Sequence, residues 1–201
     1  MAKEPPPSAW WRRALRVGLF SFVLAVLVNY SSGFALRQLP ALIALLIVFL
    51  LVAIGVVFDI LGTSVTAAEV APLNAMAAKK VTGARQALWM VRNADRVANF
   101  CNDVVGDVSG AVSGAAGATV ALRFTQLLNG DGWVEDLIGL VMIGLIAGLT
   151  VGGKAAGKSF AIERATDVVF LAGRVLYGAE TITGRSLTGS RGPNSSRRRT
   201  T

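Results

Sequence analysis

Four stretches of the chain are apolar enough to cross a lipid bilayer. No charged residue occurs in residues 17–36, 41–58 and 137–153. A helix needs about 20 predominantly apolar residues to cross a bilayer, with a range of roughly 17 to 25. Residues 108–122 are also uncharged, and they reach that length only if the polar residues before them are included. The pattern therefore predicts four transmembrane helices.

Outside these stretches, the apolar positions follow the period of surface helices. Residues 67–98 predict two short amphipathic helices that are broken near Gly83, and residues 158–180 predict a further one. Amphipathic helices of this kind usually lie along the membrane surface when they follow a span. Residues 186–201 are polar and basic, and we expect this tail to be disordered.

Composition and charge fix the orientation that we predict. Of the 201 residues, 53% are hydrophobic and 16% are charged, whereas soluble domains usually carry about 25% charged residues. Of the 20 basic residues, 18 lie before the first span, between the second and third, or after the fourth; the exceptions are Arg37 and Arg123. With four spans these three segments share one side, and basic loops mark the cytoplasmic side. We predict a multi-pass protein of the cell (inner) membrane with both termini cytoplasmic.

The predicted fold class is thus an all-α membrane protein, with four transmembrane helices plus cytoplasmic juxtamembrane and surface amphipathic helices. Residues 1–16 form a cytoplasmic N-terminal segment in this scheme, and residues 17–36 form the first transmembrane helix. In an alternative scheme, residues 1–36 are a cleaved signal peptide, although their apolar core is long for one. The net charge of +8 is explained by topology, so we expect no nucleic-acid partner.

The sequence gives little support to enzyme chemistry. It contains no histidine and a single cysteine, Cys101, which removes the commonest general base and any internal disulfide. Residues 152–159, GGKAAGKS, match the phosphate-loop pattern, but no alternating strands surround them. Glycines at four-residue spacing, at 144, 148 and 152, suit helix packing in lipid, so we expect a turn from the last span to the surface here. We predict that the protein is not an enzyme and has no organic cofactor.

Polar residues inside the predicted spans indicate a cation site. Ionised side chains within a span cost about 2.5–3.5 kcal/mol each, so they usually face a cavity and mark an ion pathway. Asp103 and Asp107 are four residues apart, which places them on one face of an α-helix. Oxygen-only ligation suits a hard cation such as Mg²⁺ rather than zinc or copper. The candidate metal ligands are the carboxylates Asp59, Asp103 and Asp107 and the neutral side chains Thr63, Ser64 and Asn102.

The same residues also allow a structural interpretation. In it, Asp59 and Asp103 are hydrated at the membrane interface or paired with Lys79, Lys80 or Arg96. Asn102 and the neighbouring serines would then form hydrogen bonds between helices.

Residues 41–180 resemble the membrane domain of the CNNM/CorB/CorC magnesium transporter family (domain of unknown function 21), without its cytosolic regulatory domains. Residues 62–67, GTSVTA, are similar to the family's S-G-S-E-T-A motif, and residues 93–96, NADR, to its N-P-[DE]-R motif. Residues 154–158, KAAGK, are similar to its E-[IL]-x-P-K motif. Val65 and Lys154 stand where these motifs carry glutamate.

The resemblance implies a homodimer with an ion site inside an acidic, inward-opening cavity and a belt-like helix after the last span. We therefore predict divalent-cation transport or sensing, with Mg²⁺ as the first candidate ion. The expected partners are the lipid bilayer, a second copy of the chain and the cation. The alternative is a non-transporting membrane scaffold or partner-binding protein whose acidic residues are structural.

Overall fold

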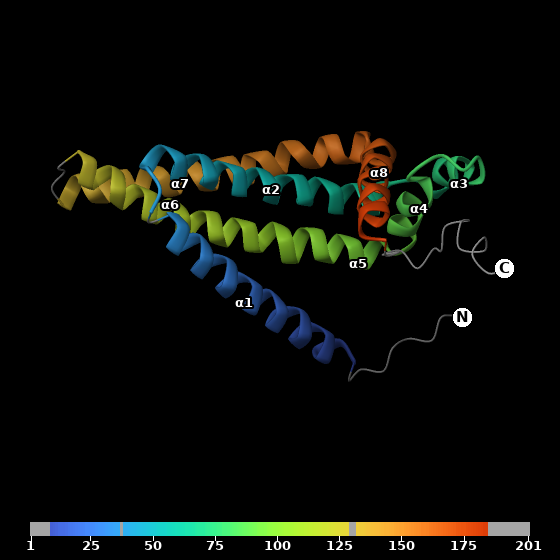
Figure 1. The fold of residues 1–201 in the computed structure, drawn as a ribbon, viewed down its shortest axis with the longest axis horizontal. Helices are drawn as coiled ribbons and strands as arrows, with labels where there is room; N and C mark the ends of the chain where they lie inside the picture. The colour runs from blue at the N-terminus through green and yellow to red at the C-terminus, as the bar shows by residue number, and fades with distance from the viewer. Residues whose placement is uncertain (1–8, 37, 129–131, 185–201) are drawn as a thin grey trace, which may run out of the picture. The chain divides into compact units, whose positions relative to one another are not determined.

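The computed structural model describes residues 9–36, 38–128 and 132–184, which form helices and no strand (Figure 1). Four helical segments of this part are long and apolar enough to cross a membrane: Ala14–Ser31, Ala41–Ala67, Ala94–Leu127 and Gly132–Glu163. The prediction of an all-α, multi-pass membrane protein is confirmed. Residues 1–8 and the predicted tail at 186–201 lie outside the described residues.

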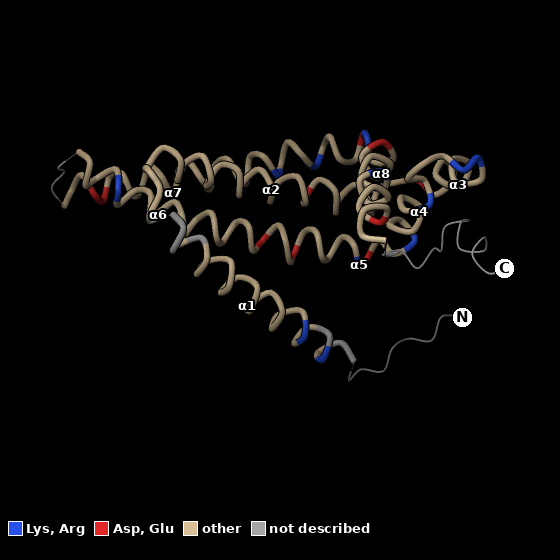
Figure 2. The backbone as a smooth tube through the Cα atoms, in the orientation of Figure 1, with Lys and Arg blue, Asp and Glu red and all other residues tan. Residues whose placement is uncertain are grey.

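The helices follow one another with short connections. In chain order they are α1 (Ala9–Leu36), α2 (Ala41–Ala67), α3 (Val70–Ala78), α4 (Ala84–Arg92), α5 (Ala94–Asn99), the π-helix η1 (Phe100–Gly106), α6 (Asp107–Leu127), α7 (Gly132–Glu163) and α8 (Ala165–Thr183). Figure 2 shows that α1, α2, α6 and α7 carry long uncharged stretches, as membrane helices must.

Contacts divide the chain into two compact units. The first, here called the span unit, comprises Met1–Asp59 and Phe100–Gly157. The second, here called the α4–α8 unit, comprises Ile60–Asn99 and Lys158–Thr201. The helices α2 and α7 each run from one unit into the other.

The core of the span unit is built from one stripe on each of three helices. Residues four apart on an α-helix share a face, and the buried side chains follow this spacing. The stripe consists of Ala44, Val48 and Val52 on α2, Ala116 and Val120 on α6, and Met142 and Ile146 on α7. Lipid tails are as apolar as these side chains, so tight packing rather than the hydrophobic effect holds such a core together.

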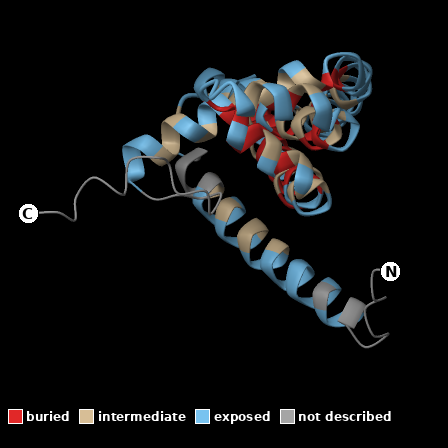
Figure 3. Cartoon of the chain, turned by 90° about the vertical axis from the view of Figure 1, so that its right-hand side faces the viewer, coloured by how far each residue is buried: buried red, intermediate tan, exposed pale blue. Residues whose placement is uncertain are grey.

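α1 contributes little to this core. It packs against α6, yet none of its membrane-spanning residues Ala14–Ser31 is buried. Figure 3 shows α1 coloured as exposed or intermediate along its described length. Its apolar side chains are therefore available to lipid.

The glycines at four-residue spacing on α7 are not the ones at which helices of this chain pack closely. A Cβ atom added to Gly144, Gly148 or Gly152 would meet no atom within 4 Å. A Cβ added to Gly55 would lie 3.1 Å from Cβ of Ser109, and one added to Gly153 would lie 2.9 Å from Cγ2 of Val56. A Cβ added to Gly117, in the middle of α6, would overlap Cδ1 of Ile146, so close approach occurs in the span core as well as at the charged end of the spans.

The third span departs from the uniform α-helix that we expected. Between α5 and α6 lies η1, a π-helical segment of seven residues. A π-helix closes hydrogen bonds from residue i to residue i+5. Asp103 lies inside η1 and Asp107 begins α6, and both are exposed, as are Ala111 and Ala115 at the same four-residue spacing.

In the α4–α8 unit, α4 packs against both α3 and α8. The predicted break near Gly83 is confirmed, since Gly83 adopts a left-handed conformation with φ 86° immediately before α4. The helices α4 and α8 meet at Gly173, where an added Cβ would lie 2.5 Å from the carbonyl oxygen of Gly83. Val65, Leu73, Ala87, Met90 and Val169 form the core of this unit.

The GGKAAGKS segment is helical throughout. α7 continues through residues 152–159 to Glu163, and α8 begins at Ala165. No strand precedes the segment within the described chain, so the segment lacks the strand–loop–helix context of a phosphate loop. The turn that we predicted at this point is wrong: the helix ends about one turn later, at Arg164.

Candidate ionic site in the membrane spans

The core stripes of the spans lead to charged residues at one end. On α2 the stripe that contains Val48 and Val52 continues through Gly55 to Asp59, at steps of three and four residues. On α7 the stripe that contains Ile146 reaches Lys154 two turns later. Helical periodicity therefore turns both charged side chains toward the interior of the span unit.

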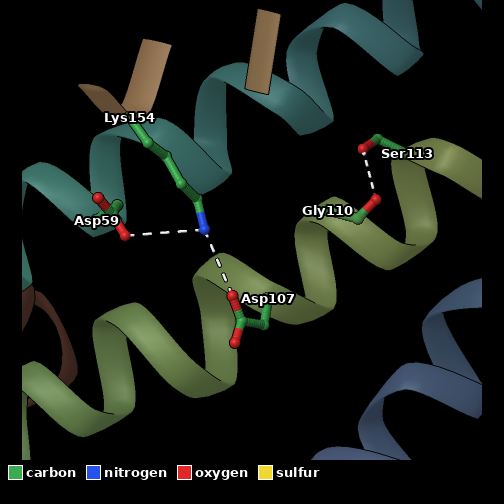
Figure 4. A network of polar contacts seen from close by, with 5 residues as sticks. All are labelled: Asp59, Asp107, Gly110, Ser113 and Lys154. Atoms are coloured by element: carbon green, nitrogen blue, oxygen red, sulfur yellow. Dashed lines mark hydrogen bonds and ion pairs between the residues drawn. The ribbon is translucent and has the colours of Figure 1, made fainter. Parts of the chain in front are cut away.

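Lys154 lies between two carboxylates. Its Nζ atom is 3.7 Å from Oδ1 of Asp59 and 3.4 Å from Oδ1 of Asp107. Figure 4 shows the lysine side chain extending from α7 toward Asp59 on α2 and Asp107 on α6. We call these residues the ionic trio. The formal charge of the trio is −1, because two carboxylates face one ammonium group.

Glycines make the space for this arrangement. A Cβ added to Gly106 would lie 3.7 Å from Nζ of Lys154 and 3.8 Å from the carbonyl oxygen of Gly55. Together with the close approach of Gly55 to Ser109, these distances show that α2 and α6 come near one another beside the trio. Small residues permit such close approach of helices in membranes.

Helix geometry places the three charged residues at a common depth. Asp59 is about 27 Å along α2 from Ala41, at a rise of about 1.5 Å per residue. Lys154 is likewise about 27 Å along α7 from Asp136, and Asp107 is about 24 Å along α6 from Arg123. The hydrocarbon core is about 30 Å thick. The trio therefore lies near one boundary of the apolar layer, at the end of these helices remote from Ala41, Arg123 and Asp136.

The three side chains differ in exposure. The side chain of Asp59 is 8% exposed, that of Lys154 22%, and that of Asp107 73%. Oδ2 of Asp59 is buried and has no hydrogen-bond partner among the residues that the structure describes. Charge-assisted hydrogen bonds usually measure about 2.7–2.9 Å, so the contacts of Lys154 at 3.4 and 3.7 Å are loose. The carboxylate of Asp59 is thus only partly compensated by Lys154 within the described structure.

The other residues predicted in the third span are placed differently from Asp107. Asp103 is exposed, whereas Oδ1 of Asn102 is buried and has no partner in the described part of the chain. No group of three or more Asp, Glu or Cys side chains able to hold a metal ion occurs among the described residues. The predicted convergence of three carboxylates is thus not found within them.

Ser64 and Thr63 belong to the α4–α8 unit. The hydroxyl of Ser64 is fully buried and donates a hydrogen bond to the carbonyl oxygen of Ala161, at 3.1 Å. Ala161 is in the last turn of α7, where carbonyl groups lack partners within the helix. Thr63 is partly buried, and its carbonyl oxygen accepts a hydrogen bond from the hydroxyl of Thr66. Ser64 therefore has a structural task, which is to satisfy the end of α7.

Lys154 was not among the residues that the sequence predicted for the site. The signal that identifies it is its spacing of eight residues from Ile146, on the buried stripe of α7. Asp59 is paired with a basic side chain, as the structural interpretation expects of an acidic residue. Its partner is Lys154 rather than Lys79, Lys80 or Arg96.

A cavity of about 270 Å³ lies elsewhere, at the junction of α4 and α5 in the α4–α8 unit. It is lined by Val91, Arg92, Asn93, Ala94, Asp95 and Arg96. This segment includes the residues similar to the N-P-[DE]-R motif, and none of the ionic trio.

No family model, no curated protein and no solved structure matches this chain. The resemblance to the magnesium transporter family therefore stays a prediction. The function has to be argued from the site itself.

Proposed function

We propose that this protein transports or senses a divalent cation, with Mg²⁺ as the first candidate, through the carboxylates of Asp59 and Asp107. The observation that carries the proposal is the burial of the Asp59 carboxylate and the lack of a partner, within the described structure, for one of its oxygen atoms. This carboxylate is buried in a membrane-spanning helix, and one of its oxygen atoms has no partner in the described structure. An ionisable group inside a membrane span costs free energy, and such groups usually serve an ion pathway.

The donor set fits a hard divalent cation. Asp59 and Asp107 supply carboxylate oxygens from two different helices, and Asp107 opens to the outside of the span unit. Mg²⁺ is commonly bound by one or two carboxylates and keeps several water molecules. A site with one buried and one exposed carboxylate suits a partly hydrated ion that enters from the exposed side.

The membrane orientation and the oligomeric state belong to the same proposal. The distribution of basic residues favours a cell (inner) membrane protein with both termini in the cytoplasm, so the trio would face the cytoplasmic side. A Cβ added to Gly144, Gly148 or Gly152 on α7 would meet no atom of the described residues within 4 Å. Small residues at this spacing favour association of helices, which supports a homodimer.

The proposal is tested by thermal melts of the protein in lipid nanodiscs, with and without millimolar Mg²⁺. A ligand at 100 times its Kd stabilises the folded state by about 2.7 kcal/mol, so a bound cation should raise the Tm of the parent measurably. Asp59→Asn and Asp107→Asn should each remove most of this rise. The matched controls are Asp103→Asn, on the same span but outside the trio, and Asp167→Asn, whose carboxylate pairs with Arg164 on the surface.

A parent Tm that does not respond to millimolar Mg²⁺ would refute the proposal. An equal response in Asp59→Asn would refute the assignment of the site. Flux of Mg²⁺ into proteoliposomes then separates transport from sensing, because only a transporter moves the ion across a sealed bilayer.

The second candidate function is a non-transporting scaffold, and the ion pair between Lys154 and Asp59 favours it. This pair compensates the buried carboxylate without any metal. On this reading the parent shows no Mg²⁺ response, and Asp59→Asn destabilises the protein because the ammonium of Lys154 loses its buried partner.

A further inference from the structure

We propose that Lys154 is a built-in competitor for the cation site: its ammonium group occupies the space between Asp59 and Asp107, and a divalent cation binds only after the lysine side chain has moved out. This inference rests on the proposed function and adds a mechanism that sets the affinity of the site. It starts from the position of Nζ, 3.4 and 3.7 Å from two carboxylates on separate helices.

The backbone of α7 is held in place beside the trio. A Cβ on Gly153 would lie 2.9 Å from Cγ2 of Val56, so α7 and α2 are in close contact one residue before Lys154. The lysine side chain, in contrast, is a flexible four-carbon stem with a compact charge at its tip. The lysine can therefore leave the site by rotation of its own bonds while the helices keep their contact.

An exit exists on the side of Asp107. The side chain of Asp107 is 73% exposed, and Lys154 itself is 22% exposed, so the ammonium already borders the open face of the span unit. Asp59, at 8% exposure, is the inner partner. A lysine that swings away keeps access to water and headgroups, whereas Asp59 keeps its place inside.

Electrostatics couples the movement to binding. With the lysine in place the trio carries a charge of −1, and an incoming divalent cation would lie close to a like charge. With the lysine out, the two carboxylates offer a charge of −2. The apparent affinity falls by the fraction of molecules in the open state, so a lysine that occupies the site at least 90% of the time weakens binding about tenfold or more.

The test uses the full chain in nanodiscs and Mg²⁺ titrations monitored by melting temperature. In Lys154→Gln the apparent Kd for Mg²⁺ should fall at least tenfold relative to the parent, because the competitor is gone. The matched control is Lys158→Gln, which removes an exposed lysine from the same helix and should leave the Kd unchanged. Lys154→Arg keeps a cation in the site and should not tighten binding.

Two further measurements do not depend on metal binding by a variant. In the parent, mass spectrometry after treatment with an amine-reactive reagent should show faster labelling of Lys154 when Mg²⁺ is present, with Lys158 as the internal reference. In the presence of a chelator, Lys154→Gln should be less stable than the parent, because the two carboxylates lose their compensating charge. The double variant Asp59→Asn/Lys154→Gln should regain most of that stability, since the buried charge is then removed as well.

The outcomes separate this inference from the function on which it rests. If the parent and Lys154→Gln bind Mg²⁺ equally and Lys154 labelling does not change, the competitor role is refuted while cation binding stands. If only Lys154→Gln responds to Mg²⁺, the competitor role stands and the lysine closes the site in the parent, which refutes transport by the parent. If neither responds, both ideas are refuted.

Discussion

The crossing of α4 and α8 offers a sharp test of the packing, through Gly173→Ala. A Cβ at this position would lie 2.5 Å from the carbonyl oxygen of Gly83 and 2.7 Å from the backbone nitrogen of Ala87. Both atoms belong to the backbone, so neither can move aside by a change of rotamer. The methyl group must push α8 away from α4, and overpacking of this kind typically costs about 1–3 kcal/mol.

Gly178→Ala is the matched control on the same helix. A Cβ there would meet no atom within 4 Å. Replacing glycine by alanine in a helix interior stabilises the helix by about 0.5–1 kcal/mol. That gain applies to both variants, so the difference between them measures the clash alone, about 1–3 kcal/mol.

Hydrogen exchange of the backbone amides in α8 measures this difference. Exchange through local opening should be about 5- to 150-fold faster in Gly173→Ala than in Gly178→Ala, because 1.4 kcal/mol corresponds to a factor of about ten. Protection in Gly178→Ala should equal or exceed that of the parent. Equal protection in the two variants would show that α4 and α8 do not meet at Gly173, and the core assigned to the α4–α8 unit would have to be revised.

Three other predictions concern the turn, the end of α7 and the topology. In chemical unfolding, Gly83→Ala should destabilise the protein more than Gly184→Ala. Both positions have positive φ, which costs about 1–2 kcal/mol for alanine. An added Cβ at Gly83 would also lie 2.7 Å from the backbone of Arg174, whereas one at Gly184 would meet no described atom within 4 Å. Equal losses would argue against that contact. Ser64→Ala should lower the free energy of unfolding by about 1 kcal/mol, because it removes the hydrogen bond to Ala161. The control is Thr66→Ala, at an exposed hydroxyl bonded within its own helix, which should stay within about 0.5 kcal/mol of the parent. A neutral Ser64→Ala would refute the capping role. In a Cys101→Ala background, a cysteine introduced at Gln38 should react with an impermeant thiol reagent added to intact cells, and one introduced at Thr82 should not. Labelling at Thr82 from outside would overturn the predicted orientation.

The sequence by itself determined the spans and the break at Gly83. A run of about 20 uncharged residues has few alternatives to a membrane helix, because every backbone polar group in lipid must be satisfied within the segment. The break at Gly83 follows equally from local chemistry, since glycine adopts the left-handed conformation without strain. These features depend on neighbouring residues along the chain, and such dependence can be read from a sequence.

The tertiary structure alone decided which polar residues meet. Asp59 and Asp107 were predicted as candidates, yet their partner Lys154 lies 47 residues beyond Asp107, and only the depth and rotation of α7 bring it between them. Asp103 and Asp107 are both exposed and four residues apart, yet among the described residues it is Asp107 and not Asp103 that lies within ion-pair distance of Lys154. In the sequence, Ser64 is a candidate metal ligand because its hydroxyl oxygen can coordinate a hard cation. In the structure, the same hydroxyl donates a hydrogen bond to the carbonyl oxygen of Ala161 at the end of α7. Contacts between helices depend on how each helix is rotated and how deep it lies, and neither quantity is encoded in the period of a single helix.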